Sequence, residues 1–182
     1  MTTTLSAFSV GNEGLLPDDL SRYIGKKTLV KLILETMEEP GARSAKCAGC
    51  GIDGAVFQPA MMLTLLTYCY ASGIYGSVDI QLGTQHDQMI RYLCAGSYPD
   101  ICMLRSFRRY HRETLEGCLT ATLRQVWELR FCGEDAEPIL GVSCIESSLR
   151  RWTDVKPTPD FKREAGKRIT QAVRADSMAA DL

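Results

Sequence analysis

The sequence predicts a mostly α-helical protein, and three observations support this fold class. Apolar residues recur at the three- and four-residue spacing of a helix face, most clearly between Pro59 and Gly73. Prolines, glycines and short polar side chains stand where such helices would begin and end. No segment alternates apolar and polar residues as a half-buried strand does. We therefore expect a compact helical domain with a helix-turn-helix-like unit, followed by an irregular segment and a basic terminal helix.

The first predicted helix follows a candidate cap. Thr28 suits an N-cap, and Leu29, Ile33 and Met37 then share one face until Pro40 stops the helix. Residues 40–58 are rich in glycine and alanine, and we expect a loop there.

A second helix is expected between Pro59, which suits a first turn, and Gly73, which suits a helix end. Its core-facing residues would be Met62, Leu65, Leu66, Cys69 and Tyr70. The apolar run 61–75 is shorter than the roughly 20 residues that cross a membrane, so no membrane partner is expected.

Further helices are expected over residues 77–82, 87–94, 100–111 and 113–131. Asp87 and Asp100 suit N-caps, and Gly133 would end the last of these helices. The chain then divides into a flexible tail (1–14), a helical domain (15–132), and an irregular linker with a basic tail helix (133–182).

Composition gives the chain the character of an ordinary globular protein. Hydrophobic residues make up 45%, charged residues 24%, and the net charge is −1. An overall positive charge is therefore absent, and an argument for nucleic-acid binding must rest on local clusters. The first residues lack a basic segment followed by a long apolar one, so we interpret the eight cysteines mostly as reduced thiols of a cytoplasmic protein.

One local cluster lies in the segment from Asp100 to Arg112. Its arginines, spaced 0, 3, 4 and 7 residues apart, would share one helix face; they are Arg105, Arg108, Arg109 and Arg112. Like charges at this spacing repel, and facing phosphates would relieve that repulsion. We expect these arginines and His111 to contact DNA. The alternative is a solvated face paired with Glu113 and Glu116.

A second basic cluster lies near the end of the chain and comprises Lys162, Arg163, Lys167, Arg168 and Arg174. Residues 150–174 hold eight basic and three acidic side chains. This segment would be a solvated tail helix, or would contact the DNA backbone.

Other chemistry finds little support in the sequence. Cys47 and Cys50 have the spacing of half a zinc site, but no second Cys-x-x-Cys follows, and His86 and His111 are not at ligand spacing. We therefore expect no metal, no cofactor and no catalytic residue.

Residues 58–77, together with the motif residues between Arg91 and His111, resemble two blocks in the N-terminal domain of bacterial insertion-sequence transposases of the InsH type. The first is residues 58–77, QPAMMLTLLTYCYASGIYGS. The second comprises Arg91–Leu93, Gly96, Pro99–Asp100 and Ser106–His111. Residues 15–19 resemble the entry segment of that family, and the likeness covers about residues 15–131.

The resemblance implies a DDE transposase whose N-terminal helical domain recognises the terminal inverted repeats of its element. In the family, three carboxylates of a following RNase H-like domain bind Mg²⁺. Here Glu146 stands in the slot of the first acid, and no chain remains after Leu182 for the others. We expect a truncated or internally deleted copy that binds DNA transposon ends and is inactive alone. The alternative is a module that associates with itself or with full-length transposase.

Overall fold

The computed structural model describes residues 28–38, 51–52, 55–56, 58–94, 96–132, 139–153 and 159–180. The helices within these ranges are α2 (Leu29–Glu38), α4 (Pro59–Ser72), α5 (Ser77–His86), α6 (Gln88–Cys94), α7 (Ile101–Tyr110), α8 (Arg112–Phe131), α9 (Ser143–Thr153) and α10 (Phe161–Ala180). The predicted mostly helical fold class is confirmed. None of the described helices is long and apolar enough to span a membrane.

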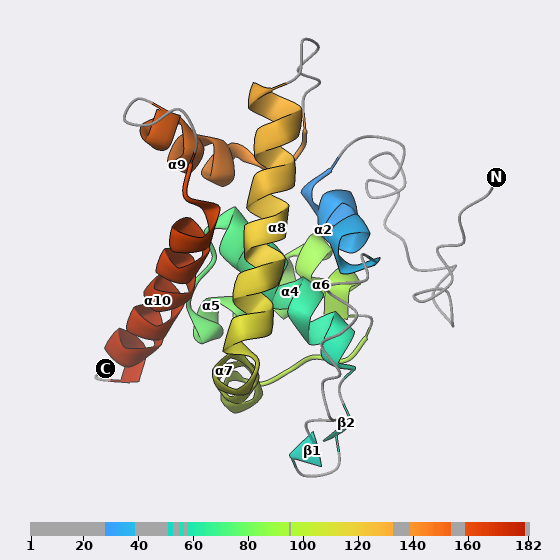
Figure 1. Cartoon of the computed structure of the whole chain (residues 1–182). Helices are drawn as coiled ribbons and strands as arrows, with labels where there is room; N and C mark the ends of the chain where they lie inside the picture. Colours follow the sequence, from blue (N-terminus) through green and yellow to red (C-terminus); the bar gives the residue numbers. More distant parts are fainter. Residues whose placement is uncertain are drawn as a thin grey trace, which may run out of the picture.

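Helix α8 forms the centre of the arrangement (Figure 1). Its 20 residues pack against α10 on one side and against α2 on the other, while α4 passes behind it. Helix α7 meets one end of α8, and α9 lies against the other half. The hydrophobic core therefore lies between α8 and the helices that surround it.

Helix α4 is buried on nearly all sides, as the long apolar run 61–75 indicates for a core helix, and its burial extends beyond the stripe that the spacing marked. Every residue from 61 to 67 is buried, because α2, α6, α8, α9 and α10 all contact this helix. Met61, Met62 and Leu65 expose 4%, 1% and 0% of their surface. A module that associates with itself through α4 would need these side chains exposed, and they are covered within one chain.

The predicted helix boundaries in the first half of the chain are mostly confirmed by their caps. Thr28 Oγ1 accepts a hydrogen bond of 3.2 Å from a backbone amide in the first turn of α2. Asp87 Oδ1 accepts hydrogen bonds of 2.8 and 2.9 Å from two backbone amides in the first turn of α6. Asp100 Oδ1 accepts one at 2.7 Å. Pro59 begins α4, and Gly73 ends it with a φ of 91°, a backbone conformation that favours glycine. Helix α5 is longer than expected, since it continues to His86.

Two segments expected to be irregular contain regular structure. Helix α9 occupies 143–153, where Ile145 and Leu149, four residues apart, are buried in the core. Strands β1 (Gly51–Ile52) and β2 (Ala55–Val56) pair antiparallel around the Asp-Gly dipeptide at 53–54, a common hairpin sequence. The strands are too short to show a period, and in the described part of α9 only Ile145 and Leu149 are buried, so its apolar period is weak.

Helix α10 differs most from its prediction, because it is an integral part of the core. Ala165, Ile169 and Ala172 are fully buried, and α8 is its main neighbour. A Cβ at Gly166 would stand 2.9 Å from Glu116 Oε1 on α8, which is the end of a flexible side chain. The predicted division at residue 133 therefore separates segments that pack together.

Some sequence-based predictions lie outside the described residues. These are the tail 1–14, the entry segment 15–19, and the roles of Pro40, Cys47, Cys50 and Gly133.

The position of α10 predicts how the fold responds to truncation of its side chains. Ile169→Ala should lower the free energy of unfolding by about 2–5 kcal/mol, because it leaves a cavity in the core. Val173→Ala, four residues away and 42% exposed, should change it by less than about 0.5 kcal/mol. Urea unfolding followed by circular dichroism measures both; equal values would mean that α10 is not part of the core.

Candidate nucleic-acid interface

The arginine-rich segment is divided between two helices, which corrects the prediction of one continuous basic face. Helix α7 ends at Tyr110, and α8 begins at Arg112. His111 joins them with φ −113° and ψ 27°; its amide donates to the last turn of α7, and its carbonyl accepts from the first turn of α8. Arg112 therefore does not continue the helix face of Arg105, Arg108 and Arg109.

Arg108 points into the protein and exposes only 6% of its surface. Its Nη1 donates to the Tyr70 hydroxyl at 3.0 Å, and its Nη2 donates to Asp176 Oδ2 in a short ion pair. Arg105 is partly exposed and reaches the same residue. Its Nε lies 3.3 Å from Asp176 Oδ2, and its Nη2 donates to the Asp176 backbone carbonyl at 3.2 Å.

Asp176 is the acceptor on which these contacts converge. Its Oδ1 accepts the backbone amide of Ser77 at 2.7 Å, and its Oδ2 accepts the Ser77 hydroxyl at 2.8 Å. We call this group, which is formed by Tyr70, Ser77, Arg105, Arg108 and Asp176, the Asp176 cluster. It joins α4, α5 and α7 to α10.

The electrostatics of the cluster favour its charged form. Burial alone would raise the pKa of Asp176, but hydrogen bonds from Arg108 and Ser77 outweigh it and hold the pKa below the usual 3.8. Burial raises the pKa of Tyr70 to about 12, so its hydroxyl stays protonated. Burial opposes the charge of Arg108, yet contact with Tyr70 and Asp176 raises its pKa.

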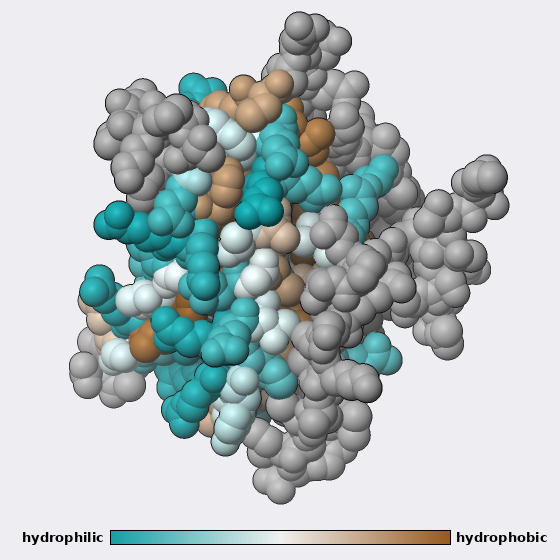
Figure 2. Space-filling view, in the orientation of Figure 1, coloured by the Kyte–Doolittle hydropathy of each residue, from teal (hydrophilic) through white to brown (hydrophobic). Residues whose placement is uncertain are grey.

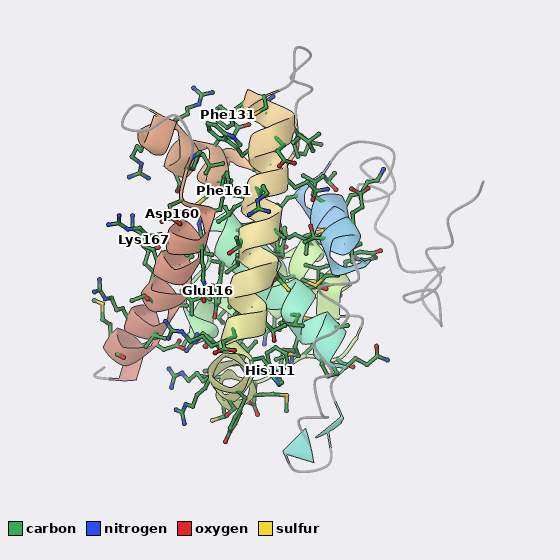
Figure 3. All side chains as sticks on the ribbon, viewed as in Figure 1. His111, Glu116, Phe131, Asp160, Phe161 and Lys167 are labelled. Atoms are coloured by element: carbon green, nitrogen blue, oxygen red, sulfur yellow. The ribbon has the colours of Figure 1, made fainter. Side chains whose placement is uncertain are left out.

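Four of the five predicted DNA-binding residues are at least partly exposed, and Arg108 is the buried one. Arg109 and Arg112 are exposed, and His111 is half-buried with its ring centroid 4.4 Å from that of Phe107. They lie where α7 meets α8, at the position of His111 in Figure 3. Arg105 and Arg108 belong instead to the Asp176 cluster.

Helix α10 presents the second basic surface. Its exposed cationic residues are Lys162, Arg163, Lys167 and Arg174. Its acidic residues Glu164 and Asp176 expose 4% and 6% and form ion pairs inside the protein. In Figure 3 Lys167 points away from α8, and Figure 2 shows hydrophilic residues over this side of the molecule. Both acids of α10 therefore turn inward, and four of its five basic residues turn outward.

Arg168 belonged to the predicted basic cluster, but the structure buries it to 1% exposure. Its Nη1 donates to the carbonyls of Tyr70 and Ala71 at 2.7 and 3.1 Å, near the end of α4. Its Nη2 donates to Ser148 Oγ of α9 at 2.9 Å. Arg168 therefore satisfies carbonyls that α4 leaves without helical partners and is unavailable to DNA.

An aromatic groove lies between α8 and the start of α10. Trp127 stacks on Phe131 with centroids 4.6 Å apart, and Phe161 lies 6.3 Å from Trp127. The Arg124 guanidinium lies 6.0 Å above the Phe161 ring. Phe131, Asp160 and Phe161 mark this region in Figure 3.

The residues singled out for other chemistry have structural roles. Glu146, in the slot of a catalytic acid, lies in α9 and forms a short ion pair with Arg130. It does not fit a Mg²⁺ site, because no group of three or more His, Cys, Asp or Glu side chains suited to a metal exists among the described residues. His86 is exposed at the end of α5. The described cysteines are free thiols.

Sequence reasoning missed the Asp176 cluster, because its members are far apart in the chain. Ser77 and Asp176 are separated by 99 residues, and Arg108 and Asp176 by 68. The only sequence signal is an acid near the C-terminal end of a helix, where the helix dipole disfavours negative charge.

Comparisons of the chain with protein-family models, with curated proteins and with solved structures gave no match.

The lowered pKa of Asp176 predicts a pH dependence of stability. The carboxylate stabilises the fold fully above its unfolded pKa near 3.8, and this contribution is lost as the pH falls through the lower folded value. At pH 7, Asp176→Ala should lower the free energy of unfolding by about 3–5 kcal/mol, since it leaves Arg108 buried without its anion. The difference in free energy of unfolding between this variant and the unmodified protein should become smaller below pH 3.8.

Urea unfolding at pH 7, 5 and 3 tests this dependence, with Ile169→Ala as the control, because its cavity does not titrate. If Asp176→Ala lowers the free energy of unfolding by the same amount at pH 7 and at pH 3, the carboxylate of Asp176 is not the stabilising group.

Proposed function

We propose that this protein binds duplex DNA, as the helical DNA-binding portion of an insertion-sequence transposase. The surface that binds DNA comprises the exposed cations of the α7–α8 junction and of α10; we call it the basic surface, and its residues are Arg109, Arg112, Lys162, Arg163, Lys167 and Arg174. The observation that carries the proposal is the sorting of charge on α10, whose buried acids leave its exposed side cationic.

The net charge of the chain is −1, which by itself would not favour binding to DNA, but the burial of the acids of α10 leaves a local positive charge on its exposed side. DNA responds to the charge that faces it, and each phosphate neutralised by a lysine or arginine releases counterions. Glu164 and Asp176 are paired inside the protein and contribute little repulsion at the surface.

The two parts of the basic surface adjoin through the Asp176 cluster. Asp176 lies in the last turns of α10 and holds Arg105 and Arg108 of α7, so the end of α10 lies beside α7. A duplex that follows the exposed side of α10 can therefore reach the α7–α8 junction. His111, half-buried at this junction, would approach the backbone with them.

The transposase assignment draws on the resemblance of residues 58–77 and of the block that ends at His111. Those blocks form α4, the start of α5, and α6 to α7. The proposed partner is DNA carrying the terminal inverted repeats of the element. The proposal assigns no catalytic step to the described residues.

Salt dependence of binding tests the basic surface. Fluorescence anisotropy with a 30-base-pair duplex should give an affinity that falls steeply between 50 and 200 mM salt. Arg109→Ala with Arg112→Ala should weaken binding and make the slope of log K against log salt shallower by about 2. Lys167→Ala with Arg174→Ala should act in the same way.

A matched control is Lys31→Ala with Arg91→Ala, which removes two exposed positive charges from α2 and α6, away from α10 (Figure 1). This variant should bind as the unmodified protein does. The proposal fails if the unmodified protein does not bind at 50 mM salt, or if the control loses as much affinity as the test variants.

Sequence preference tests the transposase assignment separately. A duplex with the inverted repeats that flank the reading frame should bind about 10³-fold or more tightly than a scrambled duplex of the same composition. Competition at 150 mM salt measures this preference. Equal affinity for the inverted-repeat duplex and the scrambled duplex would contradict the transposase assignment and be consistent only with general DNA binding.

A further inference from the structure

Helix α10 has the position and the length of an element that can enter a groove of DNA. Its main packing neighbours are α8, α5 and α4. In Figure 1 it stands at the margin of the molecule, and no other labelled helix lies on the side that faces away from α8. The helix has 20 residues and is about 30 Å long. The major groove of duplex DNA, about 12 Å wide, admits an α-helix.

The exposed cations of α10 stand in two groups that are separated along the helix. Three of them lie in the first two turns, between residues 162 and 167, and the fourth is Arg174, about 10 Å beyond Lys167. The exposed side chains between Lys167 and Arg174 are Thr170, Gln171 and Val173. Because none of these three carries a charge, the middle of α10 offers no attraction to a phosphate, whereas both ends of this interval do.

The three uncharged side chains are of types that contact base edges. A glutamine amide pairs with N6 and N7 of adenine, a threonine hydroxyl bonds to base donors or acceptors, and an apolar side chain contacts the methyl group of thymine. Thr170 Oγ1 donates to the Gly166 carbonyl at 2.8 Å, so its oxygen is left to accept. Val173 is apolar and 42% exposed, and a thymine methyl group would cover it.

We propose that α10 enters the major groove of duplex DNA, where Thr170, Gln171 and Val173 contact base edges. The cations on either side of them, Lys167 and Arg174, bind the phosphates that border the groove. Base preference then comes from the middle of α10, and the α7–α8 junction adds contacts to the DNA backbone beside it. This inference rests on the proposed function, because it assigns the base-reading residues of the same surface.

The first experiment separates base contacts from phosphate contacts. The full chain selects its preferred sequence from a random library of 30-base-pair duplexes at 150 mM salt. Thr170→Ala combined with Gln171→Ala should reduce the preference for the selected duplex over a scrambled one by about tenfold or more. The affinity for the scrambled duplex and the slope of log K against log salt should not change, since neither side chain neutralises a phosphate.

A matched control is Gln85→Ala with Gln88→Ala, which removes two exposed uncharged side chains from α5 and α6. This variant should keep the full preference for the selected duplex. The proposal is overturned if Thr170→Ala with Gln171→Ala keeps the preference of the unmodified protein, or if the control loses as much of it.

The second experiment tests the groove. Replacement of adenine by 7-deazaadenine removes N7 from the major groove and keeps base pairing and the minor groove intact. The unmodified protein should bind the substituted selected duplex about fivefold or more weakly, because the pairing of Gln171 with adenine is lost. Gln171→Ala, which lacks that pairing already, should bind the substituted and unsubstituted duplexes equally. An unchanged affinity of the unmodified protein would overturn the placement of α10 in the major groove.

The proposed function and this inference fail separately. If the unmodified protein binds no duplex at 50 mM salt, the proposed function is wrong, and the inference that rests on it is wrong as well. If the unmodified protein binds in a salt-dependent way but selects no sequence, or keeps its preference without Thr170 and Gln171, the role of α10 in base recognition is contradicted and the basic surface is not.

Discussion

The fold depends on the burial of charged side chains on α10. A helix whose inner side carries Glu164, Arg168 and Asp176 cannot pack against an apolar core unless each charge meets a partner, because an unpaired buried charge is strongly destabilising. Arg168 meets carbonyls at the end of α4 and the hydroxyl of Ser148, and Asp176 meets Ser77 and Arg108. These partners fix α10 relative to four other helices.

The same requirement shapes the surface. Because the acids of α10 are used inside, the basic residues of that helix dominate its exposed side. Packing and electrostatics are therefore coupled here, since the contacts that hold α10 in place also make its outer side positive. A chain with a net charge of −1 can in this way carry a local cationic surface.

The cluster around Asp176 links this surface to α7. Arg105 and Arg108 were expected at the solvent-facing side of a continuous basic helix, and they instead face a carboxylate 71 and 68 residues further along the chain. Both side chains donate to Asp176 and thereby hold α7 against the end of α10.

The sequence by itself determined the features that depend on neighbouring residues. The helical class, the start of α4 at Pro59, its end at Gly73 and the cap at Asp100 follow from local backbone preferences and short-range hydrogen bonds. Strands β1 and β2 escaped prediction because two residues each are too few to show a period, and α9 escaped it because only Ile145 and Leu149 of its described residues are apolar core residues.

Only the tertiary structure decided which charged residues face solvent. Arg108 and Arg109 are adjacent in the sequence, yet one is buried against Tyr70 and Asp176 while the other is exposed. Spacing places a side chain on a helix face, but the partner that makes burial of its charge favourable comes from a distant segment. The direction of each arginine is therefore a property of the packed helices, and no local pattern contains it.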